Sequence, residues 1–152
     1  MADINSFLIE WCIRYLENKD MIKKEIIKVE KNGEDDFTVH YKDRSGYFFI
    51  MTVLDESIFS RIKSDSYTGI FTLNSALNIN FIDYNWKKLA EFKLLSIYFT
   101  NPFSDSEKVW AIRPYIHNKI CDRVSLKAGL KSMAEMVVTT SAEDLNKKIK
   151  SV

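Results

Sequence analysis

The run YFFIMTVL, from Tyr47 to Leu54, constrains the fold more than any other stretch of the sequence. Successive side chains of a strand point to opposite faces, and in this run both faces are apolar. Such a strand has to be covered on both faces, so it lies inside a sheet with helices or a second subunit on either side. The sequence therefore predicts a layered protein built around a sheet.

The segments before this run supply a helix and a hairpin. From Ile4 to Leu16, apolar residues recur every three or four positions, which predicts an amphipathic helix. Its apolar sector is wider than one surface requires, so we expect it to pack on two sides. Apolar and polar residues then alternate on both sides of the turn Asn32-Gly33, which predicts two antiparallel strands.

The rest of the chain adds further strands and helices. Asp55 is a suitable cap for a short helix, and the Phe92–Phe99 segment has the bulky composition of a strand. Helical spacing returns at Leu126–Val137 and around Leu145–Ile149. We expect a single α+β domain over residues 1–152, with a mainly antiparallel sheet, an N-terminal helix, a mid-chain helix and C-terminal helices, in the order α-βββ-α-β(n)-α. This element order resembles that of the type III secretion chaperones and the small bacterial regulators that share their fold.

Residues 67–89 fit two interpretations. Leu77, Ile79 and Phe81 alternate with polar residues as in a strand, whereas the wider apolar pattern also fits a helical stripe. Several asparagines in the segment weaken a helix. Of the two, the strand is the interpretation that we favour.

The segment VWAIRPYIHNK carries the most specific candidate surface. Read as a strand from Val109 to His117, it places Arg113, Tyr115, His117 and Lys119 on one face. Because Pro114 cannot donate to a ladder, the strand would be an edge or bulged there. The exposed row would suit a phosphate, a carboxylate or a single-stranded base, since arginine forks onto oxyanions and tyrosine stacks. The alternative is a solvated edge that its charges protect from aggregation.

Other candidate chemistry is weak in this sequence. The acidic residues Glu34, Asp35 and Asp36 crowd a hairpin tip, in an order that does not fit a metal-dependent nuclease. The two cysteines form no CxxC pair, and a dyad of His117 with Cys121 has no local support. With 4 glycines, the chain has no phosphate loop of either common type. We therefore assign no catalytic residue, no metal site and no cofactor.

Charge and apolar patterning lead to two hypotheses about function. The formal net charge is +1, so nucleic-acid binding would need a local patch. The excess of apolar faces favours a non-catalytic binding or adaptor protein, chaperone-like or regulatory, that forms a homodimer or binds a protein partner. The alternative is a nucleic-acid-binding or nucleic-acid-processing protein that uses the Arg113–Lys119 row. Neither a signal peptide nor a membrane span is indicated, so we expect a cytoplasmic protein.

Overall fold

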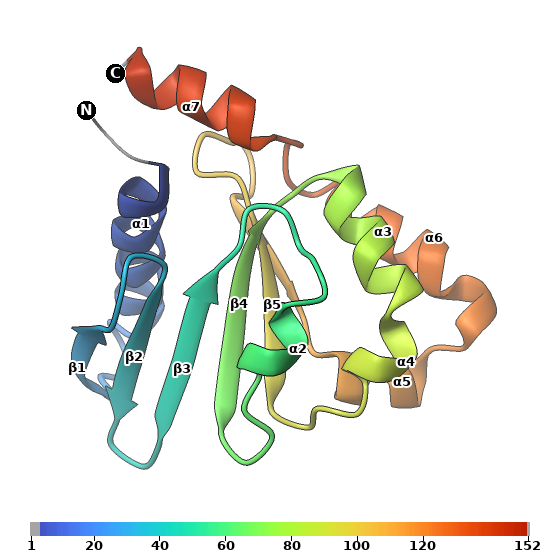
Figure 1. Cartoon of the computed structure of the whole chain (residues 1–152), viewed down its shortest axis with the longest axis horizontal. Coiled ribbons are helices and arrows are strands. Elements are labelled where there is room, and N and C mark those ends of the chain that lie inside the picture. Colours follow the sequence, from blue (N-terminus) through green and yellow to red (C-terminus); the bar gives the residue numbers. More distant parts are fainter. Residues whose placement is uncertain (1–3, 152) are drawn as a thin grey trace.

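A computed structural model describes residues 4–151 as a six-stranded sheet with helices on both faces (Figure 1). The strands follow one another across the sheet in chain order. Three of the five pairings are antiparallel, and β3–β4 and β4–β5 are parallel. The α+β class and the mainly antiparallel sheet are thus confirmed. The strands are β1 (Ile26–Lys31), β2 (Asp36–Tyr41), β3 (Ser45–Ile50), β4 (Tyr67–Leu73), β5 (Leu95–Thr100) and β6 (Val109–Ile112).

The helices divide the molecule into two hydrophobic cores. One face of the sheet packs against α1 and α7, and the other packs against the remaining helices. In Figure 1, α1 lies beside the first three strands and α3 to α6 gather on the far side of β5. The helices are α1 (Ile4–Lys19), α2 (Ile58–Arg61), α3 (Ala76–Tyr84), α4 (Trp86–Leu89), α5 (Pro114–Ile120), α6 (Arg123–Ala134) and α7 (Ala142–Lys150). None of these helices is long and apolar enough to cross a membrane.

The strand predicted at 47–54 is confirmed for residues 47–50, which belong to β3 (Ser45–Ile50). Phe48 and Ile50 are buried in the α1 core, while Phe49 is buried in the opposite core. The strand ends before Leu54, however. The side chain of Asn78 accepts a hydrogen bond from the Leu54 amide and donates one to the Thr52 carbonyl, so a distant side chain holds this segment as a loop.

The apolar cover of the central strands comes from the chain itself. Residues on two sides of α1, including Leu8, Cys12 and Ile13, are buried against the sheet and α7. The predicted two-sided packing of this helix therefore needs no second subunit. The homodimer stays a prediction that these contacts do not test.

Two segments differ from the sequence interpretation. Within residues 67–89, the favoured strand is confirmed for 67–73 as β4 but is wrong from Ala76 to Leu89, which forms helices α3 and α4. Ser75 caps α3 by accepting a hydrogen bond from the main-chain amide of Asn78. The strand predicted from Val109 to His117 is confirmed only as far as Ile112. Pro114 begins helix α5, where its lack of an N–H costs nothing and its fixed φ suits the first turn.

Candidate functional site

The four residues of the predicted row do not share one strand face. Arg113 is the residue that precedes α5, and Tyr115, His117 and Lys119 lie on that helix. The row depended on the alternation continuing through Pro114, and this geometry is wrong because the helix turns successive side chains by about 100°. The four residues are therefore assigned to three separate environments.

Tyr115 and Lys119 stay together on the surface of α5. The Lys119 ammonium lies 4.2 Å from the centre of the Tyr115 ring, and Lys93 approaches the same ring at 5.9 Å. The hydrogen bond and charge of Lys119 lower the pKa of the Tyr115 hydroxyl. This pair makes a basic and aromatic surface beside the end of β6.

His117 points away from that surface. Its Nδ1 lies 3.0 Å from the carbonyl oxygen of Arg113, and the ring lines a cavity of about 260 Å³ between β6 and α6. The Cys121 thiol donates to the main-chain oxygen of His117 rather than to the ring. Both side chains thus contact main-chain carbonyl oxygens in or next to α5 rather than each other, so they do not form a catalytic pair.

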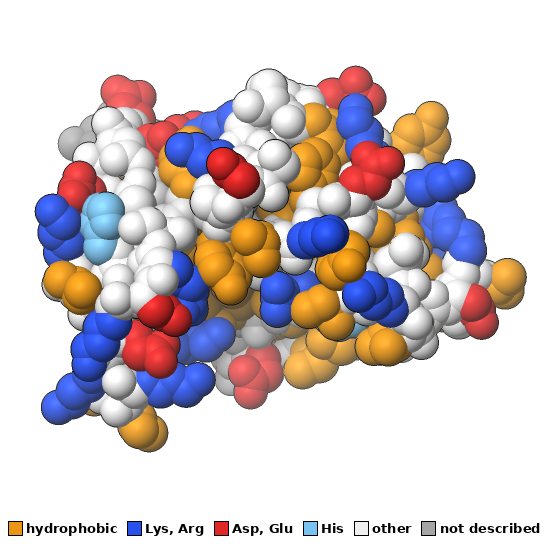
Figure 2. All heavy atoms as spheres, turned by 90° about the horizontal axis from the view of Figure 1, so that it is seen from below, with side chains coloured by type: hydrophobic (Ala, Val, Ile, Leu, Met, Phe, Trp, Pro, Cys, Tyr) orange, Lys and Arg blue, Asp and Glu red, His pale blue; other side chains and the backbone are white. Residues whose placement is uncertain are grey.

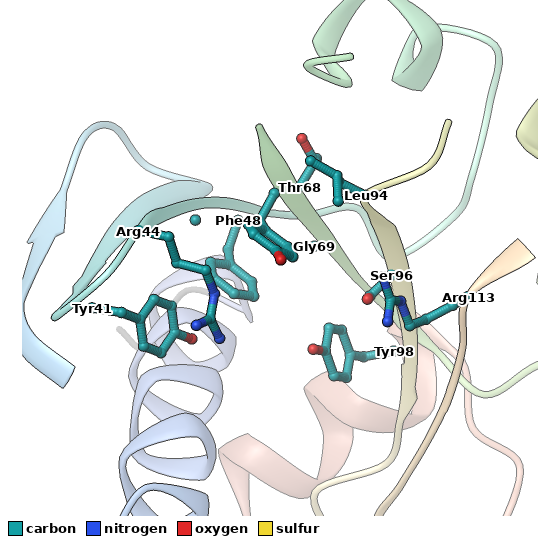
Figure 3. A pocket seen from close by; sticks show the side chains of 11 residues that line it. Tyr41, Arg44, Phe48, Thr68, Gly69, Leu94, Ser96, Tyr98 and Arg113 are labelled. Atoms are coloured by element: carbon teal, nitrogen blue, oxygen red, sulfur yellow. The ribbon is translucent and has the colours of Figure 1, made fainter. Parts of the chain in front are cut away.

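Arg113 lines a pocket of about 200 Å³ on the α1 side of the sheet, which we call the Tyr–Arg pocket (Figure 3). Four strands and three strand-flanking segments contribute to it, at the end of the sheet where β2 and β6 finish and β3, β4 and β5 begin. Its principal lining residues are Tyr41, Arg44, Gly46, Phe48, Tyr67, Gly69, Ser96, Tyr98 and Arg113.

Two guanidinium groups face this pocket from opposite sides (Figure 3). Arg44 lies over the rings of Tyr41 and Tyr67, at 4.4 and 5.0 Å from their centres, and one of its nitrogens is 3.0 Å from the Asp43 carboxylate. Arg113 is half-buried, and within residues 4–151 no carboxylate lies within ion-pair distance of it. A cation that is partly withdrawn from water without an internal anion is available to an external one.

Tyrosine hydroxyls make up much of the remaining polar lining. Burial raises the pKa of Tyr98, although the Ser96 hydrogen bond and the charges of Arg113 and Arg44 oppose this rise. Burial also raises the pKa of Tyr41 to about 12, and the neighbouring Tyr98 adds to the shift. Both hydroxyls therefore stay protonated at neutral pH and can donate hydrogen bonds to an anion.

These shifted tyrosines predict a loss of stability at alkaline pH. Tyr15, beside Tyr98, also has its pKa raised to about 12, mainly by burial. In the unfolded chain both Tyr15 and Tyr41 ionise near pH 10. The contribution of these two hydroxyls to the free energy of unfolding is therefore fully present below about pH 10. It is lost as the pH rises from about 10 to 12, because the unfolded state loses these protons first. Denaturant unfolding at several pH values should show a flatter decline in the double variant Tyr15→Phe/Tyr41→Phe, while Tyr84→Phe, at an exposed residue, should leave the decline unchanged.

Two glycines make room for the aromatic floor of the pocket. The Phe48 ring lies over Gly69 on the adjacent strand, so closely that a Cβ placed there would come within 2.5 Å of the ring. A Cβ on Gly46 would come within 2.9 Å of the same ring. Without side chains at these two positions, Phe48 lies flat across the strands and the Tyr–Arg pocket remains open above it.

The end of the molecule that holds the pocket is basic. The five loops and strand ends that meet there contain eleven Lys and Arg residues against five Asp and Glu, in a chain with a formal net charge of +1. Figure 2, which looks at this end, shows basic side chains interleaved with hydrophobic ones. The segments are 19–25, 41–46, 63–68, 86–95 and 113–121.

The acidic hairpin tip, by contrast, is neutralised internally. Arg61 donates to both carboxylate oxygens of Asp35, at 3.1 and 3.2 Å, and to the Tyr47 hydroxyl at 3.0 Å. Tyr47 in turn donates to Asp36 at 2.8 Å. Within residues 4–151 no group of three His, Cys, Asp or Glu side chains is arranged to hold a metal ion.

Comparison with known proteins adds no assignment. The chain matches no protein-family model, no curated protein and no solved structure. Of the pocket residues, sequence reasoning found only Arg113. The others come from three stretches of the chain, around residues 41–48, 67–69 and 94–98, which meet at one end of the sheet.

Proposed function

We propose that this protein is a non-catalytic binding protein whose Tyr–Arg pocket takes a ligand with a phosphate group and a flat ring. The observation that carries the proposal is the half-buried Arg113 guanidinium, which faces the pocket without a carboxylate partner among residues 4–151. Arg44 faces it across the pocket. Two guanidinium groups suit a phosphate because each can donate two parallel hydrogen bonds.

The aromatic lining supports a flat group attached to that phosphate. Tyr41, Tyr67 and Tyr98 surround the cavity, and Phe48 forms its floor. Such rings stack on planar ligands, and their hydroxyls remain neutral donors. The excess of positive charge at this end of the molecule attracts an anionic ligand over a distance of about 10 Å at moderate salt.

The proposal is tested with deoxythymidine monophosphate as the probe, measured by calorimetry. We expect binding that is weaker for thymidine, which lacks the phosphate, and that falls by about 10–100-fold in Arg113→Ala, the range that a charge-assisted hydrogen bond of ~1.5–3 kcal/mol implies. Lys127→Ala is the matched control, because it removes one positive charge from the exposed surface of α6, away from this pocket.

Two results would contradict the proposal. The first is no measurable binding of the nucleotide up to about 10 mM, where the binding free energy would be under ~3 kcal/mol. The second is equal binding by the wild type and Arg113→Ala. Thermal unfolding of the variant separates a lost contact from a lost fold.

A further inference from the structure

The Tyr–Arg pocket is continued by a second cavity on the same face of the sheet. This cavity, of about 680 Å³, lies between α1 and the start of β6. Tyr15, which lines it, meets Tyr98 of the Tyr–Arg pocket at a ring distance of 6.4 Å. We call the second cavity the α1–β6 trough. Its lining residues are Trp11, Arg14, Tyr15, Asn18 and Ser106–Val109.

Strand β6 connects the two cavities along its length. Val109 lines the trough and Arg113, directly after the strand, lines the Tyr–Arg pocket. Strand alternation places the small, exposed Ala111 between Val109 and Arg113, although its main cavity contact is with the His117 cavity. At about 3.4 Å per residue, the path from Val109 to Arg113 is about 14 Å long, which is longer than one nucleotide.

The wall of the trough offers aromatic rings and positive charge. Trp11 and Tyr15 stack in parallel on α1, with ring centres 5.7 Å apart. Arg14 is exposed on the same helix, and Lys108, in the loop before β6, also lines the trough, where its ammonium donates a hydrogen bond to the Ser104 carbonyl oxygen. Glu107 is the one acidic residue in the lining.

We infer that the ligand is a single-stranded nucleic acid, held with a phosphate in the Tyr–Arg pocket and its neighbouring nucleotides along the trough. This inference rests on the proposed function. At the duplex rise of about 3.4 Å per nucleotide, the path accommodates at most about four nucleotides, and an extended single strand fits fewer. Single strands suit a surface of this kind, because unpaired bases stack on aromatic side chains while cations follow the phosphates.

An acidic peptide is the main competing ligand. An extended peptide that added to the free edge of β6 would use main-chain groups at that edge. The aromatic and basic side chains lie instead over the α1-facing surface of the sheet, beside the edge. The arrangement therefore favours bases and phosphates over a peptide backbone.

The test compares a 5′-phosphorylated thymidine tetranucleotide with deoxythymidine monophosphate. We expect the tetranucleotide to bind at least about tenfold more tightly, since one further stacked base contributes ~1–3 kcal/mol. Arg14→Glu should weaken the tetranucleotide about tenfold and leave the mononucleotide unchanged, and Lys127→Glu should change neither. Trp11→Ala should likewise weaken the tetranucleotide and leave the mononucleotide unchanged, and Trp11→Phe should restore tetranucleotide binding. Thermal unfolding checks that each variant is folded.

The outcomes separate the inference from the proposed function. If the mononucleotide binds in an Arg113-dependent manner but the tetranucleotide is no tighter, the inference is wrong and the proposed function stands. A tetraglutamate peptide that binds as tightly as the tetranucleotide would also overturn the inference. If mononucleotide binding is absent or independent of Arg113, both fail.

Discussion

Replacing Asn74 by alanine is expected to lower the free energy of unfolding by about 3–5 kcal/mol. Asn74 is completely buried, and its amide nitrogen donates to the carbonyl oxygens of Ala134 and Val137 at 3.0 and 2.8 Å. Its side-chain oxygen accepts from the Trp110 indole at 2.8 Å. Alanine would remove these three bonds and leave buried polar groups at the end of α6 and on β6 without partners.

Denaturant unfolding measures this loss, with Asn80→Ala as the matched control. Asn80→Ala is the same substitution at an exposed position on α3, where we expect the free energy of unfolding to change by less than about 0.5 kcal/mol. A loss below about 1 kcal/mol in Asn74→Ala would show that water replaces the amide. The prediction that Asn74 is essential for joining β4, β6 and α6 would then be wrong.

Asparagine also explains why α3 could not be predicted. Asn74 and Asn78 weaken a helix when judged by propensity alone, which favours the strand interpretation of this segment. In the folded chain, the Asn78 side chain donates to the carbonyl oxygens of Thr52 and Leu73. Both asparagines thus satisfy main-chain groups of other segments, and a local pattern carries no information about partners so far away in sequence.

The α5 segment shows a different limit. The alternation from Val109 to Ile112 is real, and the strand there is confirmed. Pro114 fits both an edge strand and the first turn of a helix, so it does not decide between them. Ile116 and Ile120, four residues apart, are both exposed on α5, so no buried apolar stripe marks this short helix in the sequence.

The layered architecture could be predicted from the sequence more readily than the site. Burial can be predicted from the apolar pattern within a single segment, as at residues 4–16 and 47–54. The Tyr–Arg pocket depends instead on strand register, which brings Gly69 opposite Phe48 and Arg44 beside Tyr67. Similarly, the net charge of +1 gives no sign of the basic end of the molecule, because that end forms only when five separate segments meet in the fold.

Replacing Gly69 by alanine is expected to lower the free energy of unfolding by about 1–3 kcal/mol, because the new Cβ would overlap the Phe48 ring. The ring has little room to move, since it is buried and stacks on Phe37 at 5.3 Å. Gly129→Ala provides a control of opposite sign. Gly129 lies within helix α6, where a Cβ would meet open space, so alanine there should raise stability by about 0.5–1 kcal/mol.

A double-mutant cycle separates the steric cause from a general loss of strand stability. In a Phe48→Leu background the smaller side chain leaves space for the new methyl group, so Gly69→Ala should cost at least about 0.5 kcal/mol less than in the wild type. An equal cost in both backgrounds would show that the Phe48 ring is not what requires glycine at this position. Denaturant unfolding of the four proteins of the cycle decides between these outcomes, and the same contact determines whether the floor of the Tyr–Arg pocket stays flat.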